Sequence, residues 1–267
     1  FPAGGNTDIG ARILASIAEK DLGQPITVVN KGGAGGQIGF TEGARARPDG
    51  YTVTFINLPS VSTIVLDPER KAAFKMDSFV PVVNQVLDPG VVWVKADSPY
   101  KTFGDLLDAA KKAPGKISAC TTGILSDDHL AILMVDDAAK VNFRIVHFEG
   151  SAQQLTGVMG GHVDCAFDNV GGIVKRVKSG ELRALVVTDD VRSKFLPDVP
   201  TTKELGLPSV ISSSTRGIAV PKGTPADAIK VLETAFLKAI NDPEHIKKMD
   251  EQGLALKPMV GAEYAND

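Results

Sequence analysis

The residues best suited to chemistry lie at the start of the chain, where a glycine pair precedes a predicted helix. Gly4 and Gly5 carry no side chain, so the backbone there can approach a bound molecule closely. The helix presents unpaired N–H groups and the positive end of its dipole, which suits an anion such as a carboxylate. Asp8 does not attract an anion itself, but it could cap the helix or hold a bridging water. An ordinary capped helix start is the alternative that this pattern leaves open.

Polar residues also follow several predicted strands. They are Asn57 and Ser60 after the strand ending at Ile56, Thr121, Thr122 and Gly123 after the strand ending at Cys120, and Asp168 after the strand ending at Phe167. In open α/β sheets, ligands bind outside the carboxyl ends of the strands. Each residue taken alone is also a common turn former. Their repetition at equivalent strand ends favours a binding site for a polar ligand.

Arg216 is the cation best placed to join such a site. It lies in the segment Ser212-Ser213-Ser214-Thr215-Arg216-Gly217, directly before a predicted apolar strand. If that strand crosses between two parts of the fold, a guanidinium beside it could bind a carboxylate through two hydrogen bonds. A solvated surface arginine is the alternative.

Other kinds of site find little support in the sequence. Gly33 and Gly35 match the first two positions of G-x-G-x-x-G, but Ile38 occupies the last, so a tight turn is favoured over a phosphate site. The four histidines have no metal-ligand spacing, and no G-x-S-x-G occurs. Cys120 and Cys165 end short apolar stretches, which favours two buried free thiols over a disulfide. We therefore expect no catalytic residue, no metal and no cofactor.

The elements that position these residues alternate between strand and helix, which predicts an α/β fold with mostly parallel sheets. A helix with Ile9, Ile13 and Ile17 on one face is expected from 6–8 to Gly23, with Asn6-Thr7-Asp8 as its N-cap cluster. Strands are expected at 25–29, 51–56, 116–120, 143–147, 163–167 and 182–187. Helices are expected at 102–112, after 126–128, at 151–160 and 171–178, and from Pro225, as first helical residue, to about 241.

Two apolar runs, 91–94 and 217–221, enclose a complete α/β series, so the chain is expected to leave one lobe, build another and return. This predicts a discontinuous first lobe (1–95 plus 221–267) and a second lobe (96–220), with the ligand in a cleft between them. The 267 residues, of which 43% are hydrophobic, suffice for two such lobes. A formal net charge of −3 without a basic tract argues against nucleic acid as a partner. No apolar run approaches the roughly 20 residues of a membrane span.

Short motifs in the same order along nearly the whole chain resemble those of the substrate-binding proteins of tripartite tricarboxylate transporters, the Bug family. The motifs are FPAGGNTD (1–8) with AR (11–12), GAGG (33–36), PDGYT (48–52), GGHVDCAFDN (160–169), GELRALVVT (180–188), LPDVPT (196–201) and VPKGTP (220–225). The resemblance implies a type II periplasmic-binding-protein fold, with two α/β lobes joined by crossing hinge strands that close on the ligand. It also implies a monomeric periplasmic receptor that delivers a small carboxylate to membrane transporter subunits.

The resemblance further implies which residues bind the ligand. The first loop would hold a carboxylate through backbone amides and ordered waters, and the second lobe would add one loop and one aspartate. Carried over, these residues are Ala3, Gly4, Gly5, Thr7 and Asp8 in the first loop, and Thr121, Thr122, Gly123 and Asp168 in the second lobe.

Two departures from the family pattern alter these expectations. The family has a strand before the first loop and a longer C-terminal helical end, and neither is present in this sequence; a signal peptide is also absent from it. A natural chain longer than this sequence is therefore expected, because a missing central strand would leave backbone groups unpaired. Many members also carry an aromatic pair where this chain has Thr215-Arg216. The arginine at this place predicts a ligand with a second acidic end, a dicarboxylate.

Two functions from other classes remain as alternatives. One is a two-lobed enzyme acting on a carboxylate, with Cys120 or Asp168 as its reactive group; this requires a base within hydrogen-bond reach. The other is a sensory module whose ligand-bound form contacts a regulator.

Overall fold

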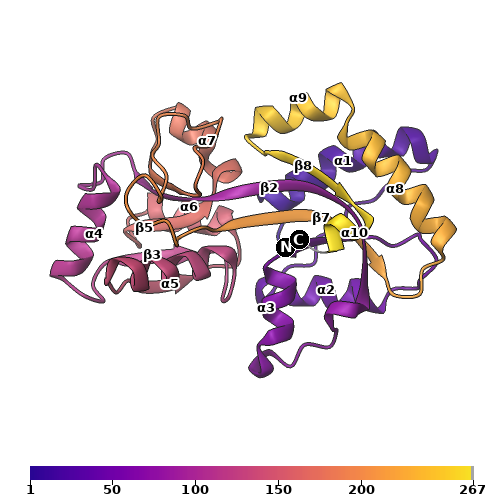
Figure 1. Cartoon of the computed structure of the whole chain (residues 1–267), viewed down its shortest axis with the longest axis horizontal. Coiled ribbons are helices and arrows are strands. Elements are labelled where there is room, and N and C mark those ends of the chain that lie inside the picture. Colours follow the sequence, from indigo (N-terminus) through magenta and orange to yellow (C-terminus); the bar gives the residue numbers. More distant parts are fainter. Residues whose placement is uncertain (266–267) are drawn as a thin grey trace. The chain divides into compact units, whose positions relative to one another are not determined.

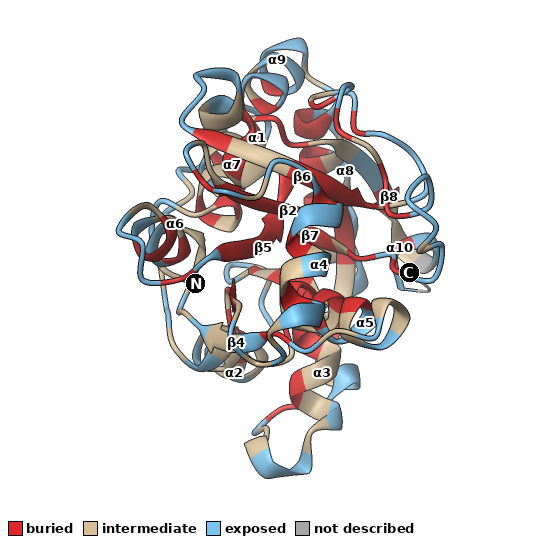
Figure 2. Cartoon of the chain, turned by 90° about the vertical axis from the view of Figure 1, so that its left-hand side faces the viewer, coloured by how far each residue is buried: buried red, intermediate tan, exposed pale blue. Residues whose placement is uncertain are grey.

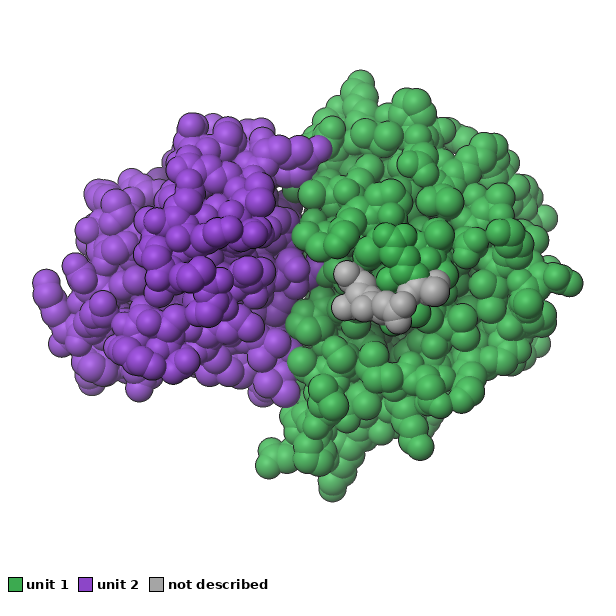
Figure 3. Space-filling model, in the orientation of Figure 1, with its two compact units in different colours: residues 1–87, 215–267 green, residues 88–214 purple. Residues whose placement is uncertain are grey.

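The computed structural model describes residues 1–265, which belong to two compact units. Unit 1 comprises Phe1–Leu87 and Thr215–Asp267, and unit 2 comprises Asp88–Ser214 (Figure 3). Two strands, β2 (Phe79–Lys95) and β7 (Ser213–Pro221), contribute residues to both units (Figure 1). The predicted boundaries between the lobes lie at 95/96 and 220/221. The boundaries between the compact units lie earlier in the same two strands, at 87/88 and 214/215.

Unit 1 surrounds strands of both chain segments with helices. Besides the shared strands, its elements are α1 (Asn6–Leu22), η1 (Ala34–Gly36), α2 (Gln37–Arg45), β1 (Thr54–Leu58), α3 (Ser60–Leu66), η2 (Pro68–Arg70), η3 (Met76–Ser78), α8 (Ala226–Ile240), α9 (Pro243–Gln252), β8 (Leu256–Val260) and α10 (Gly261–Ala265). Helix α1 ends where predicted, because Gly23 adopts φ 65° and its N–H bonds to the carbonyl of Glu19. Leu14 and Ile17 of α1 are buried in one core with Phe236 of α8. Pro225 precedes α8 as its N-cap residue, not as its first helical residue.

The strand predicted at 25–29 does not form. Residues 25–32 have no regular secondary structure, although Val28 and Val29 have the composition of a strand. A strand requires a partner for its backbone groups, and no described ladder includes this segment. In unit 1, β1–β7 and β2–β8 pair antiparallel, whereas mostly parallel pairing was expected.

Unit 2 has the order β6-β2-β5-β3-β4 in its sheet. Its own strands are β3 (Ser118–Thr121), β4 (Arg144–His147), β5 (Cys165–Asn169) and β6 (Leu182–Thr188), and its helices are α4 (Phe103–Lys112), α5 (Asp127–Ala139), α6 (Ser151–Met159) and α7 (Val170–Lys178). Strand β3 pairs in parallel with β4 and β5, whereas β2 pairs antiparallel with β5 and β6. The sheet strands β2 and β5 are buried, and exposed residues lie on the outer helix surfaces (Figure 2).

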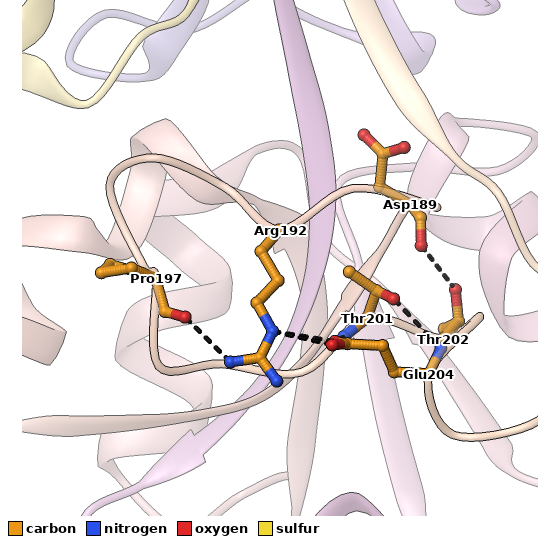
Figure 4. Close-up of polar contacts among 6 residues, drawn as sticks. All are labelled: Asp189, Arg192, Pro197, Thr201, Thr202 and Glu204. Carbon is orange, nitrogen blue, oxygen red and sulfur yellow. Dashed lines mark hydrogen bonds and ion pairs between the residues drawn. The ribbon is translucent and has the colours of Figure 1, made fainter.

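The segment after β6 is an ordered loop held by polar contacts (Figure 4). Arg192 bonds to both carboxylate oxygens of Glu204, at 3.0 and 2.9 Å, and to the carbonyl of Pro197 at 2.9 Å. The hydroxyl of Thr202 donates to the carbonyl of Asp189 at 3.3 Å. These contacts give the LPDVPT motif a structural role within unit 2.

Candidate functional site

The backbone of the first loop leads directly into helix α1. Gly4 has φ 84°, a conformation that favours glycine, and Gly5 is the N-cap residue without any side-chain cap. The predicted cap cluster of Asn6, Thr7 and Asp8 is therefore wrong, since these residues already lie inside the helix. The first N–H groups of α1 have no acceptor within the helix and remain available to an anion. Ala3 and Gly4 are exposed.

Asp8 holds this loop in place. Its Oδ2 accepts from the Gly4 N–H at 2.9 Å, and its Oδ1 accepts from Arg12 Nε at 2.9 Å and Asn30 Nδ2 at 2.8 Å. Burial by itself would raise the pKa of Asp8, but the hydrogen bonds from Gly4 and Asn30 and the charge of Arg12 lower it below its ordinary value. Asp8 thus stays ionised and shapes the loop. Asn30, far away in the sequence, was not predicted.

Three further predicted residues lie on β1, β7 and α3 of unit 1, and one of them contacts α1. Asn57 lies within β1, and its Nδ2 donates to Thr7 Oγ1 at 3.0 Å. Asn57 and Arg216 are direct partners across the antiparallel β1–β7 ladder, so their side chains leave the same face of the sheet. Arg216 is only 4% exposed, which excludes the solvated surface arginine. Ser60 is buried at the start of α3.

The same elements contain buried polar atoms that have no hydrogen-bond partner among the described residues. They include Asn6 Nδ2 in α1, Asn57 Oδ1 in β1 and Thr215 Oγ1 in β7. Buried polar atoms are satisfied in the great majority of cases, so a group of exceptions marks a place where a polar ligand could supply the missing partner. Asn6 and Thr215 were not predicted as binding residues, since neither follows a strand.

In unit 2, the predicted loop after β3 is organised by a second aspartate. Thr122 donates to Asp128 Oδ2 through both its N–H, at 3.0 Å, and its hydroxyl, at 2.6 Å. The Thr121 hydroxyl donates to the carbonyl of Gly123 at 3.1 Å. Burial and the neighbouring Asp127 and Asp168 raise the pKa of Asp128 well above its ordinary value. The loop is thus preformed, and its threonine hydroxyls are already engaged.

Asp168 lies at the same sheet edge, because β3 and β5 are neighbouring parallel strands. It belongs to β5, whereas the sequence placed it after the strand. Its Oδ1 accepts from the Ser151 hydroxyl at 3.1 Å and the Asn169 N–H at 2.7 Å. Burial raises the pKa of Asp168 to about 7.

Both cysteines are free and buried, as expected. Burial, with the nearby Asp168 and Asp128, raises the pKa of the Cys120 thiol far above its ordinary value, so Cys120 is a poor nucleophile. Among residues 1–265, no three metal-ligating side chains gather in one place. Within the same range, no helix combines the length and apolar character of a membrane span.

The comparison with known families decides the identity of this architecture. Residues 10–265 match the model of the tripartite tricarboxylate transporter family receptors, TctC. The chain belongs to this family.

Solved structures of relatives agree with the family assignment. The periplasmic binding protein BugD is 31% identical, with a TM-score of 0.87 over 96% of this chain and 85% of that chain. MatC from Rhodopseudomonas palustris, solved with malate, is 27% identical, with a TM-score of 0.88 over 96% and 87%. The R. palustris protein Rpa4515, solved with adipate, is 25% identical, with a TM-score of 0.92 over 100% and 89%. The expected two-lobed, type II periplasmic-binding-protein fold is confirmed, and this TctC-family chain is a solute-binding receptor.

Proposed function

We propose that this TctC-family receptor acts in the periplasm, captures a small dicarboxylate and delivers it to the membrane subunits of a tripartite transporter. The ligand would contact the first loop (Ala3, Gly4, Gly5 and Thr7), Asn57, Ser60 and Arg216 in unit 1, and Thr121, Thr122, Gly123 and Asp168 in unit 2. Asp8 would contribute indirectly, because its hydrogen bond from Gly4 holds the first loop in shape. Support for the ligand class comes from MatC and Rpa4515, whose structures contain malate and adipate.

One observation carries the proposal: two groups suited to carboxylates belong to neighbouring elements of unit 1. The start of α1 offers N–H groups without an acceptor inside the helix, and Arg216 lies buried one strand away, opposite Asn57. One ligand carboxylate would accept from the N–H groups, and the second would pair with the guanidinium. A monocarboxylate could engage only one of the two groups, whereas a dicarboxylate could engage both and gain the second charge-assisted contact.

Calorimetric titration of mono- and dicarboxylates into the protein and into Arg216→Ala tests this assignment. A charge-assisted hydrogen bond contributes about 1.5–3 kcal/mol, so dicarboxylate affinity should fall roughly 10- to 100-fold while monocarboxylate affinity changes little. Arg216→Lys should recover part of the affinity, because it keeps the charge without the two-pronged geometry. Arg47→Ala, at a side chain that is 90% exposed, is the matched control. Equal losses for both ligand classes would remove Arg216 from the site, and absence of binding by any carboxylate would overturn the function.

A further inference from the structure

Two histidines of unit 2 have rings in contact and take no part in the proposed carboxylate site. His129 lies in the first turn of α5, and His147 is the last residue of β4. The ring centroids are 4.7 Å apart and the ring planes meet at 76°, an edge-to-face arrangement. Each ring also bonds to a residue of the loop 121–126, so the pair joins this loop to two elements of the fold.

His129 holds the end of the loop that leads into α5. The Leu125 N–H donates to His129 Nδ1 at 2.9 Å, and the His129 N–H donates to Ser126 Oγ at 3.3 Å. Ser126 is the N-cap residue of α5, so the arrangement resembles a capping box in which an imidazole takes the place of a carboxylate. Leu125 has φ 58°, a left-handed conformation that a leucine rarely adopts. The bond to Nδ1 thus helps to hold a strained residue in place.

This bond requires a neutral His129. Nδ1 can accept a hydrogen bond only while it carries no proton, so the proton of the neutral ring lies on Nε2. A second proton would have to bind at Nδ1, where it would face the Leu125 N–H. Two donors would then oppose each other, and the loop would lose this attachment to α5.

His147 holds the other end of the loop in a different way. Its Nδ1 lies 2.7 Å from Thr121 Oγ1. The Thr121 hydroxyl has a single hydrogen, which it donates to the carbonyl of Gly123, so His147 Nδ1 is the donor in the first contact. A further proton on His147 would bind at Nε2 and leave this bond intact. His147 therefore acts on the loop through its charge, which would lie beside the ring of His129.

The surroundings of both rings oppose protonation. Burial lowers the pKa of His129 below its ordinary value of 6.5, and the neighbouring His147 lowers it further. Partial burial also lowers the pKa of His147, the more exposed of the two. A histidine whose folded pKa lies below its unfolded value makes the fold less stable as pH falls from about 6.5 through the folded pKa. The Leu125 bond should therefore weaken on the acid side of neutrality.

The aspartates near the loop respond to acid in the opposite sense. Asp127 and Asp128 precede His129 on α5, and Asp128 accepts two hydrogen bonds from Thr122. Burial and neighbouring carboxylates raise the pKa of Asp128, so its protonation stabilises the fold as pH falls. The loop 121–126 itself contains no charged side chain. A loss of loop order in acid would thus come from the histidine pair and not from these carboxylates.

We propose that His129 and His147 form an acid-sensitive switch of the loop 121–126, which is ordered while both rings are neutral and opens when His129 gains a proton. Opening would separate Leu125 from α5 and disturb the adjoining residues 121–123. The consequence for the ligand rests on the proposed function, which places these residues at the carboxylate. The receptor would then bind its carboxylate at neutral pH and release it in mildly acidic surroundings.

Hydrogen exchange without any ligand tests the switch. Protection of the Leu125 and Gly123 amides, corrected for the intrinsic effect of pH, should fall at least about fivefold from pH 7.5 to pH 5.5. His129→Asn places an amide oxygen near the position of Nδ1, where it can accept from Leu125 but cannot gain a proton, so its protection should stay constant. His162→Asn, at an exposed histidine outside the loop, is the matched control and should behave like the natural protein. Constant protection in the natural protein, or an equal fall in His129→Asn, would overturn the proposal.

A second variant keeps the switch testable if His129→Asn does not fold. His147→Asn retains an amide donor for Thr121 and removes the charge beside His129. The loss of Leu125 protection should therefore move to higher pH, and an unmoved transition would contradict the coupling of the two rings.

Calorimetry with malate and adipate separates the switch from the proposed function. From pH 7.5 to pH 5.5, affinity should fall roughly three- to tenfold more in the natural protein than in His129→Asn, because only molecules with an ordered loop are competent to bind. Equal falls would overturn the release of ligand by acid. If neither compound binds at pH 7.5, the proposed function fails for these ligands, and the exchange measurement still decides the switch.

Discussion

Asp8 and Asp128 perform the same structural task in the two units, but the pKa values of their carboxyl groups are shifted in opposite directions. Each lies in the first turn of a helix and accepts a backbone N–H from the loop before it, from Gly4 in unit 1 and from Thr122 in unit 2. Arg12 and Asn30 also bond to Asp8, and its pKa is lowered. Asp128 is bonded by Thr122, and burial together with two neighbouring aspartates raises its pKa. The comparison teaches that the same loop contact is compatible with either shift: the pKa rises where burial and neighbouring carboxylates dominate, and falls where several donors and a cation outweigh burial.

Asp8→Asn is expected to have the larger effect. The substitution weakens the pairing with Arg12 and directs an amide donor at other donors, so the Gly4 loop should lose its fixed shape. Carboxylate affinity, measured by calorimetry, should fall roughly 10- to 100-fold, corresponding to about 1.4–2.8 kcal/mol. Asp21→Asn, on the same helix but outside the loop, is the control. An unchanged affinity in Asp8→Asn would show that the loop does not need its ionised aspartate.

Asp128→Asn should be tolerated and should alter the pH dependence of stability. A carboxyl group whose folded pKa lies above its unfolded value of 3.8 destabilises the fold as pH rises from that value through the folded pKa. The amide oxygen can still accept both Thr122 hydrogen bonds. We therefore expect the variant to gain several degrees of Tm over the natural protein at pH 8 and little at pH 4. Asp97→Asn, at an exposed side chain, should show no such difference. A loss of stability at pH 8 would contradict a raised pKa of Asp128.

Replacing Asp168 should change the pH dependence of stability in the same direction, within a defined range of pH. Its pKa of about 7 places the loss of stability between roughly pH 4 and pH 7. Asp168→Asn preserves an acceptor for Ser151 and Asn169, so its thermal stability should vary less with pH across this range than that of the natural protein. An unaltered pH profile would assign the titration to another carboxyl of the cluster.

Thr122→Val should give the smallest effect. It removes the hydroxyl bond to Asp128 at 2.6 Å and keeps the backbone N–H bond. The free energy of unfolding in urea should fall by about 0.5–1.5 kcal/mol. Thr122→Ser should restore most of this loss, and a serine variant as unstable as the valine variant would indicate that packing, not the hydroxyl, is responsible.

Local signals explain what the sequence predicted well. Gly23 ends α1 because glycine adopts the left-handed conformation without strain, and Thr102 starts α4 by a reciprocal capping pair with Asp105. The loops proposed to bind the ligand were located because glycines and hydroxyl residues follow strands or precede helices. The segment 25–29 was misread, since strand formation depends on a partner that no local pattern reports.

Contacts between distant residues explain what was missed. Asn30 bonds to Asp8 across 22 positions, so no spacing rule connects them. Helix α9 was not predicted, although Asp242 caps its start and Pro243 is its first residue, because its buried face consists of only His245 and Met249. The clustering of Asn57 with Arg216 required the antiparallel register of β1 and β7.

The two native thiols have a practical consequence for measurement. Cys120 and Cys165 have no exposed surface, so neither should react with a maleimide dye while the protein is folded. A single cysteine introduced on the surface would then be the only labelled position, without removal of any native residue. The chain is thus suited to a fluorescent sensor that reports its ligand in solution, built from one substitution and one dye.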